Sequence, residues 1–87
     1  MTLPRKAIDR VLGTYAVGEM HLKVFMEGTQ LKAQMAGQPA IDVFAESPYN
    51  FFLTVVDATL EFATGDTSSP AVSLRQGGQA IEFQRIP

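Results

Sequence analysis

The stretch that decides the fold is Met20-His-Leu-Lys-Val-Phe-Met-Glu27, which continues through Gly28-Thr29 into Gln30-Leu-Lys-Ala-Gln-Met-Ala36. Apolar residues recur at every second position in both halves, and most of the positions between them are polar. This period of two predicts two β-strands, and the glycine between them predicts a hairpin turn. One face of such a hairpin is buried and the other faces water, which is typical of antiparallel sheets.

The same period continues along most of the chain after Gly13. Turn residues such as Gly37-Gln38-Pro39 and Gly77-Gly78 separate the runs. Before Gly13, the segment Arg5–Leu12 has apolar residues at helical spacing and follows Pro4, which predicts one or two helical turns. The predicted strands are Thr14–Val17, Met20–Glu27, Gln30–Ala36, Ala40–Ala45, Asn50–Val56, Ala58–Thr64, Ala71–Gln76 and Gln79–Ile86.

Eight short strands in a meander have two unpaired edges unless the sheet closes on itself. We therefore predict an all-β fold, a small eight-stranded antiparallel up-and-down barrel with a short N-terminal helix capping one end. A strongly curved open half-barrel or a small sandwich is the alternative architecture. Because 87 residues suffice for one modest core, residues 1–87 are predicted to form a single domain.

Composition excludes several functional classes. Hydrophobic residues make up 46% of the chain and charged residues 18%, values that are ordinary for a globular protein and too apolar for a disordered one. The formal net charge is −2, without long runs of one sign, so no nucleic-acid partner is expected. The chain has no cysteine, which removes thiolate catalysis, disulfides and cysteine-ligated metals.

The sequence predicts neither a membrane span nor an export signal. No stretch approaches the roughly 18 apolar residues of a membrane helix, and the charged N-terminal residues are not followed by the apolar run of a signal peptide. The chain as written is therefore expected to be cytoplasmic. A domain cut from a longer exported protein would have the same appearance.

No catalytic, metal-binding or cofactor-binding group is predicted. His21 is the only histidine, and it lies in the polar phase of its strand beside Lys23, where an exposed side chain is expected. A metal site would need carboxylates around this single imidazole. The spacing of the candidate acids gives no pair for acid–base chemistry; they are Asp42, Glu46, Asp57, Glu61 and Asp66.

Four stretches of the chain resemble a known family. They are Val11-Leu-Gly-Thr-Tyr15, Leu31-Lys-Ala-Gln-Met-Ala-Gly-Gln-Pro39, Phe51-Phe-Leu-Thr-Val-Val-Asp57 with Leu60-Glu-Phe62, and Leu74-Arg-Gln-Gly-Gly78 with Arg85-Ile86. They look like the small lipocalin-like domain of unknown function that is usually appended to the C-terminus of β-lactamase-related serine hydrolases of the penicillin-binding and CubicO type. The resemblance covers Ala7 to Ile86, with Arg75 departing from the histidine that such domains often carry.

The resemblance implies a lipocalin-like barrel that performs no chemistry and helps to shape oligomers or access to a neighbouring active site. The expected partner is therefore a serine hydrolase domain or a second copy of the chain. A hydrolase of this class needs serine three residues before lysine and a Lys-Thr-Gly element, and the sequence has neither. The run Ser47-Pro-Tyr-Asn50 is interpreted as a turn.

The alternative function is a stand-alone carrier of a small apolar ligand. An eight-stranded barrel either holds one small ligand or is filled by its own side chains. The inward residues are numerous enough to fill a narrow interior. In a wider barrel an adaptable apolar lining is predicted from Tyr15, Met26, Met35, Phe62 and Phe83.

The segment between residues 44 and 56 places large apolar groups on both faces of one predicted strand. Because contiguous exposed apolar groups are typical of interfaces, Phe52 and Val56, with Phe44 or Phe25 adjacent, are predicted to form an association surface. Arg85 shares the inward phase of Phe83. It is predicted to lie at a barrel rim and to pair with a carboxylate, since an isolated buried charge is costly.

Overall fold

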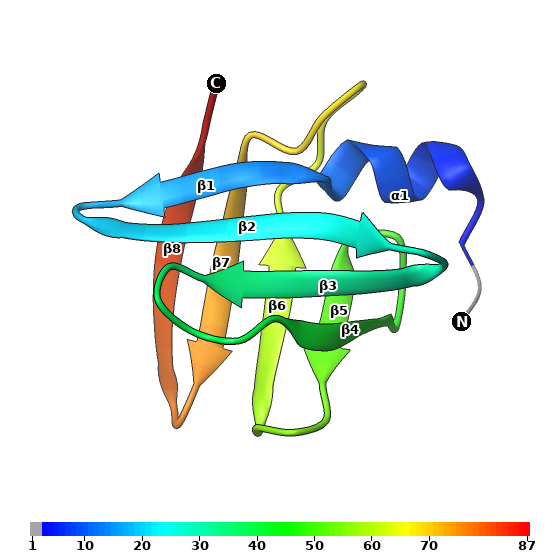
Figure 1. Ribbon diagram of the computed structural model, residues 1–87. Helices are drawn as coiled ribbons and strands as arrows, with labels where there is room; N and C mark the ends of the chain where they lie inside the picture. The colour runs from blue at the N-terminus through cyan, green and yellow to red at the C-terminus, as the bar shows by residue number, and fades with distance from the viewer. Residues whose placement is uncertain (1–2) are drawn as a thin grey trace.

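The computed structural model describes residues 3–87. Each strand pairs antiparallel with the next, and the last pairs with the first, so the sheet closes into a barrel (Figure 1). The predicted all-β up-and-down barrel with an N-terminal helix is confirmed, and the open half-barrel and the sandwich are excluded. The elements are α1 (Arg5–Val11), β1 (Gly13–Val17), β2 (Met20–Glu27), β3 (Gln30–Met35), β4 (Ile41–Ala45), β5 (Asn50–Leu53), β6 (Ala58–Phe62), β7 (Ala71–Gln76) and β8 (Gln79–Ile86).

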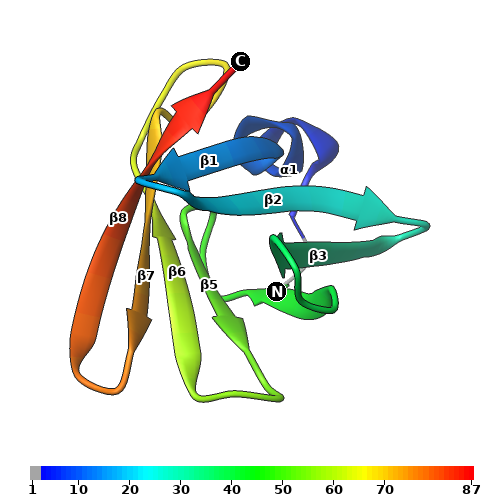
Figure 2. The same cartoon turned by 60° about the vertical axis from the view of Figure 1, so that its left-hand side comes forward.

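The barrel has two unlike ends. In Figure 1, β1, β2 and β3 cross the front, and β5 to β8 run behind them in a steeply different direction. Figure 2 shows that the β5–β6 and β7–β8 hairpins extend away from α1. We call the end covered by α1 the helix end and the end formed by these two hairpin turns the open end.

β5 is shorter than the sequence pattern predicts. It ends at Leu53, where a strand was expected through Val56. Leu53 pairs with Ala58 of β6, so the four residues between them have to reverse the chain. The amide of Ala58 donates a hydrogen bond to the carbonyl of Val56 (3.0 Å) within this turn. Two valines with high strand propensity are thus placed in a turn by the pairing on either side of them.

Aromatic side chains fill the barrel at its centre and toward the helix end. Phe62 meets Tyr15 and Phe51 edge-on, with ring centroids 5.8 Å and 5.3 Å apart, which is a favourable geometry for aromatic pairs. These rings are almost completely buried, as is Phe83. The remaining buried members of the core are Val11, Leu22, Val24, Leu31, Ala33, Val43, Leu60 and Val72.

Arg85 joins the last turn of α1 to the barrel wall. Its guanidinium donates hydrogen bonds to three backbone carbonyls and one hydroxyl, those of Arg10, Leu12, Ser69 and Tyr15. The last carbonyls of a helix have no partner within the helix, and the helix dipole favours a cation there. The predicted carboxylate partner of Arg85 is therefore wrong, because backbone carbonyls at the helix end solvate this charge.

Gly13 and Tyr15 complete the surroundings of this guanidinium. The φ angle of Gly13 is +144°, which favours glycine, and a Cβ atom at this position would collide with Nη1 of Arg85. The Tyr15 ring lies under the guanidinium, 4.8 Å from its carbon, and its hydroxyl donates to the carbonyl of Val11 (2.8 Å). One arginine and one tyrosine thus satisfy successive carbonyls at the end of α1.

The seam between β3 and β4 is the shortest in the barrel. Only two residue pairs, Lys32 with Asp42 and Ala33 with Ile41, define its register, whereas six define the register of β2 with β3. Beyond Ala33 the two strands diverge into the loop that carries Gln38 and Pro39. This divergence leaves space at the open end.

Candidate functional site

Exposed apolar side chains gather at the open end. We define the open-end rim as Met20, Val55, Val56 and Ile81, whose exposed fractions are 41%, 71%, 37% and 37%. Within residues 3–87 the remaining exposed large hydrophobic side chain is Phe52, which lies on the outer wall. Among the described residues, four of the five exposed large hydrophobic side chains therefore belong to the open-end rim of the barrel.

The exposure of Ile81 follows from the unequal lengths of two neighbouring strands. β8 has eight residues and β1 has five, and only residues 84–86 of β8 pair with β1. Within residues 3–87, the first half of β8, which includes Ile81, consequently extends past β1 and pairs only with β7. In the alternation of β8, Ile81 shares a phase with the buried Phe83, but the side chain of Ile81 is 37% exposed.

A pocket of about 130 Å³ lies at the open end, and Val56 of the open-end rim is part of its lining. Its most deeply buried lining residues are Leu22, Leu60, Ala33 and Ala58. The rest of the lining is Met35, Gln38, Pro39, Ile41, Leu53, Val56, Leu74 and Gln76. Among the described residues no charged side chain contributes to this lining, so the pocket is apolar inside, with two amide side chains in its wall.

The β7–β8 turn holds one of these amides at the mouth. Gly77 and Gly78 have φ angles of +60° and +79°, the pair of positive values that a tight two-residue hairpin turn requires. Gln76 and Gln79 pair directly across the turn, which confirms the predicted hairpin. The turn leaves the Gln76 side chain exposed and lining the pocket.

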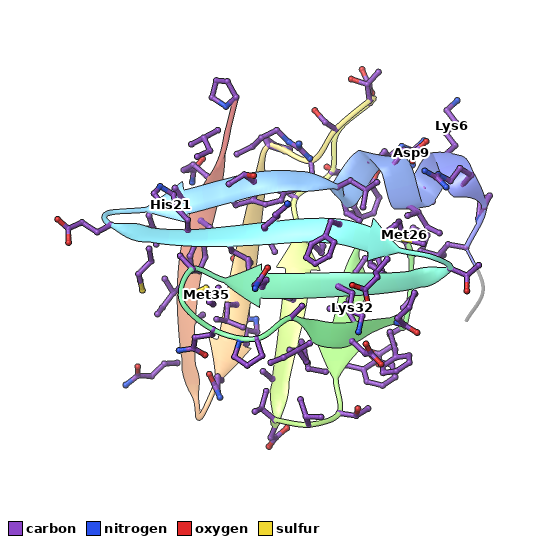
Figure 3. The ribbon with its side chains drawn as sticks, in the orientation of Figure 1. Lys6, Asp9, His21, Met26, Lys32 and Met35 are labelled. Atoms are coloured by element: carbon purple, nitrogen blue, oxygen red, sulfur yellow. The ribbon has the colours of Figure 1, made fainter. Side chains whose placement is uncertain are left out.

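The structure distributes the five predicted ligand-lining residues over three places. Tyr15, Phe62 and Phe83 are part of the filled core. Met35 lines the open-end pocket, whereas Met26 lines a separate groove at the helix end. Figure 3 shows the two methionines toward opposite ends of the barrel. All five side chains point inward as predicted. They form no common cavity because they lie at different depths along the barrel axis, and alternation does not predict that depth.

The four predicted interface residues also separate. Phe44 and Phe52 are cross-strand neighbours on the outer wall, with ring centroids 5.7 Å apart. Phe25 also faces outward, with the ammonium of Lys23 5.1 Å from its ring centroid. Val56 instead lines the open-end pocket, because it lies in a turn and not in a strand. The predicted continuous patch through Phe52 and Val56 is therefore corrected to an outer aromatic pair and a separate rim.

The charged residues that form ion pairs lie away from the open-end pocket. Lys32 contacts Asp42 (2.6 Å) and Glu27 (3.8 Å), and the hydrogen bond to Asp42 is the main cause of its raised pKa. His21 is exposed, as predicted. Within residues 3–87, no group of three or more histidine, aspartate or glutamate side chains is placed to hold a metal ion. No helix of the described chain is long and apolar enough to cross a bilayer.

Burial raises the pKa of Tyr15 to about 12, while the charge of Arg85 acts in the opposite direction. Below about pH 9 the phenol is almost fully protonated in both the folded and the unfolded chain. Between pH 10 and about 12 the unfolded chain loses this proton first, so stability falls as the pH rises. We expect a loss of about 2 kcal/mol from this group across that range.

Urea denaturation of the native chain and of Tyr15→Phe at pH 8, 10 and 11.5 measures this effect. The variant lacks the hydroxyl, so it should be less stable at pH 8 by about 1 kcal/mol. Its deficit should shrink above pH 10, because only the native chain has this phenol to ionise. A deficit that stays constant with pH would contradict the assignment.

Comparisons of the chain with protein-family models, with curated proteins and with solved structures find no match. The likeness to lipocalin-like domains therefore stays a prediction from the sequence. Three of the stretches that carry it contribute residues to the open-end pocket, including Pro39, Val56 and Gln76. Val56 belongs to one of these stretches, to the open-end rim and to the pocket lining.

Proposed function

We propose that the protein is a non-catalytic accessory module whose open-end rim binds a β-lactamase-related serine hydrolase domain. One observation carries the proposal: among the described residues, four large apolar side chains are exposed in the open-end rim, and one of them, Val56, also lines an apolar pocket. Single exposed apolar residues are ordinary on protein surfaces, but a group of them around a concavity is typical of an interaction site. The choice of a hydrolase follows from the family resemblance.

The distribution of charge supports a binding role for this end. The ion pairs lie on α1 and on the outer wall, as Arg5–Asp9, Lys32–Asp42 and Arg75–Glu61. An interface core is depleted in charged residues, and its rim is polar. The open end has this composition, because two exposed polar side chains, Gln38 and Gln76, line its apolar pocket.

Glutamate substitutions in the rim test the proposal. Titration calorimetry with a purified β-lactamase-related serine hydrolase domain from the same genome should detect binding by the native chain. Ile81→Glu and Val56→Glu should each weaken that binding at least about tenfold, because each buries a charge in an apolar interface. Phe52→Glu is the matched control, since Phe52 is also 37% exposed but lies on the outer wall. It should bind like the native chain.

Two results would overturn the proposal. The first is the absence of hydrolase binding by the native chain. The second is loss of binding in Phe52→Glu with full binding in the rim variants, which would move the interface to the outer wall. Sedimentation velocity of the chain alone tests the other predicted partner, since a dimer that Ile81→Glu dissociates would replace the hydrolase by a second copy.

The open-end pocket favours a second candidate function, a carrier of a small apolar ligand. Native mass spectrometry of gently purified protein tests it directly. A mass excess that disappears on denaturation supports a carrier. A bare mass, together with hydrolase binding, supports the accessory module alone.

A further inference from the structure

Two small residues line the open-end pocket at inward positions of the barrel wall. Ala33 on β3 and Ala58 on β6 are both buried, and each contributes only a methyl group to the lining. The rings of Phe51 and Phe62 meet edge-on elsewhere in the barrel interior. The small side chains of Ala33 and Ala58 contribute to the space in the open-end pocket.

The volume sets the size of an occupant. An apolar cavity of about 150 Å³ in a protein core is large enough to stay dry and to bind benzene. The open-end pocket has about 130 Å³ and is partly open to solvent, so an occupant can enter without unfolding the barrel. One six-carbon ring or a short alkyl chain matches this space.

The lining sets the charge of an occupant. Leucine, isoleucine, valine, alanine and methionine side chains make up most of the wall, and the described lining includes no charged side chain. A charged group placed here would lose its hydration without gaining an ion-pair partner. Gln38 and Gln76 are exposed and line the pocket, and their side-chain amides both donate and accept hydrogen bonds.

From these observations we infer that the open-end pocket binds a neutral small molecule that carries one six-carbon apolar group and a hydrogen-bonding head. The apolar group lies against Leu22, Leu60 and the two alanines. The head lies at the mouth, within reach of the glutamine amides. This inference rests on the carrier function proposed above and gives it a ligand class; hydrolase binding by the rim does not depend on it.

Benzyl alcohol and benzoate are a matched pair of probes, because they share the ring and differ in charge. Methyl NMR spectra of the native chain should show saturable shifts with benzyl alcohol, with a Kd on the order of 1 mM. The shifts should be confined to pocket methyls, such as those of Ile41, Leu53 and Leu74. Benzoate should bind at least about tenfold more weakly.

Ala58→Leu places three additional carbons in the pocket and should weaken benzyl alcohol binding at least about tenfold. Ala80→Leu is the matched control, because Ala80 is exposed on β8 and pairs with the outward-facing Arg75. It should bind benzyl alcohol like the native chain. The same spectra report whether each variant is folded, and the comparison of alcohol with benzoate on the native chain needs no variant.

Three results would overturn the inference. They are the absence of saturable shifts with benzyl alcohol, equal binding of benzoate, and shifts centred on Met26 at the helix end. The hydrolase titration is performed without either probe. Failure of ligand binding and failure of partner binding are therefore distinguished by separate measurements.

Discussion

Replacing Arg85 with methionine is expected to lower the free energy of unfolding by about 3 to 5 kcal/mol, a large part of the stability of a domain this small. Methionine retains much of the side-chain length but donates no hydrogen bond. The carbonyls of Leu12 and Ser69 would lose a charged donor. Arg10 would keep the amide of Ser69 as a donor to its carbonyl, so this acceptor is only partly affected. Urea denaturation followed by circular dichroism measures the loss.

Arg75→Met is the matched control for this prediction. Arg75 lies on β7, the strand next to the one that carries Arg85, but its side chain is exposed. It forms an ion pair with the carboxylate of Glu61 at 2.9 Å. Surface ion pairs of this kind contribute roughly 1 kcal/mol or less. Arg85→Lys should recover only part of the stability, because an ammonium lacks the planar fork of donors that reaches several carbonyls at once. Equal effects at positions 75 and 85 would contradict the structural role of Arg85.

Truncating Phe62 to alanine is expected to cost about 3 to 5 kcal/mol of unfolding free energy. Its ring lies between those of Tyr15 and Phe51, so its removal leaves a cavity in the middle of the filled part of the barrel. Because the surrounding strands are paired into a closed barrel, they can move only a little into that space. Thermal and urea denaturation of the purified variant give the change in stability.

Phe44→Ala makes the same chemical change on the outer wall. Phe44 is half-buried and stacks on Phe52 across β4 and β5, an arrangement for which about 1 kcal/mol is expected. The two variants therefore separate loss of core packing from loss of a surface aromatic pair. If Phe44→Ala were the more destabilising, the assignment of inward and outward faces on these strands would be wrong.

The barrel was predictable because local and long-range requirements coincide along most of the chain. In the hairpin of β2 and β3, alternation predicts one apolar face on each strand, and the structure pairs Leu22 with Met35 and Met26 with Leu31. Strand ends were less predictable where propensity and pairing conflict. Val55 and Val56 have strand propensity, but the pairing of Leu53 with Ala58 requires a turn there.

The candidate site was less accessible from sequence because alternation reports direction and not depth. Met26 and Met35 share a phase but lie toward opposite ends of the barrel (Figure 3). The exposure of Ile81 depends on where β1 ends, and the different predicted lengths of Thr14–Val17 and Gln79–Ile86 were a usable signal for it. The partners of Arg85 were not predictable, because they are backbone carbonyls that the chain brings together only after folding.

The short seam between β3 and β4 has a dynamic consequence. Regions with few backbone pairs open at lower free energy than the rest of a fold, so amides along this seam should exchange with deuterium before those of β2 and β7. Ala33 and Ile41, which form one of its two pairs, also line the open-end pocket. Separation of the two strands at this seam would widen the open-end pocket, while α1 continues to cover the helix end. The pocket would then admit ligands larger than its volume of about 130 Å³ in the closed barrel.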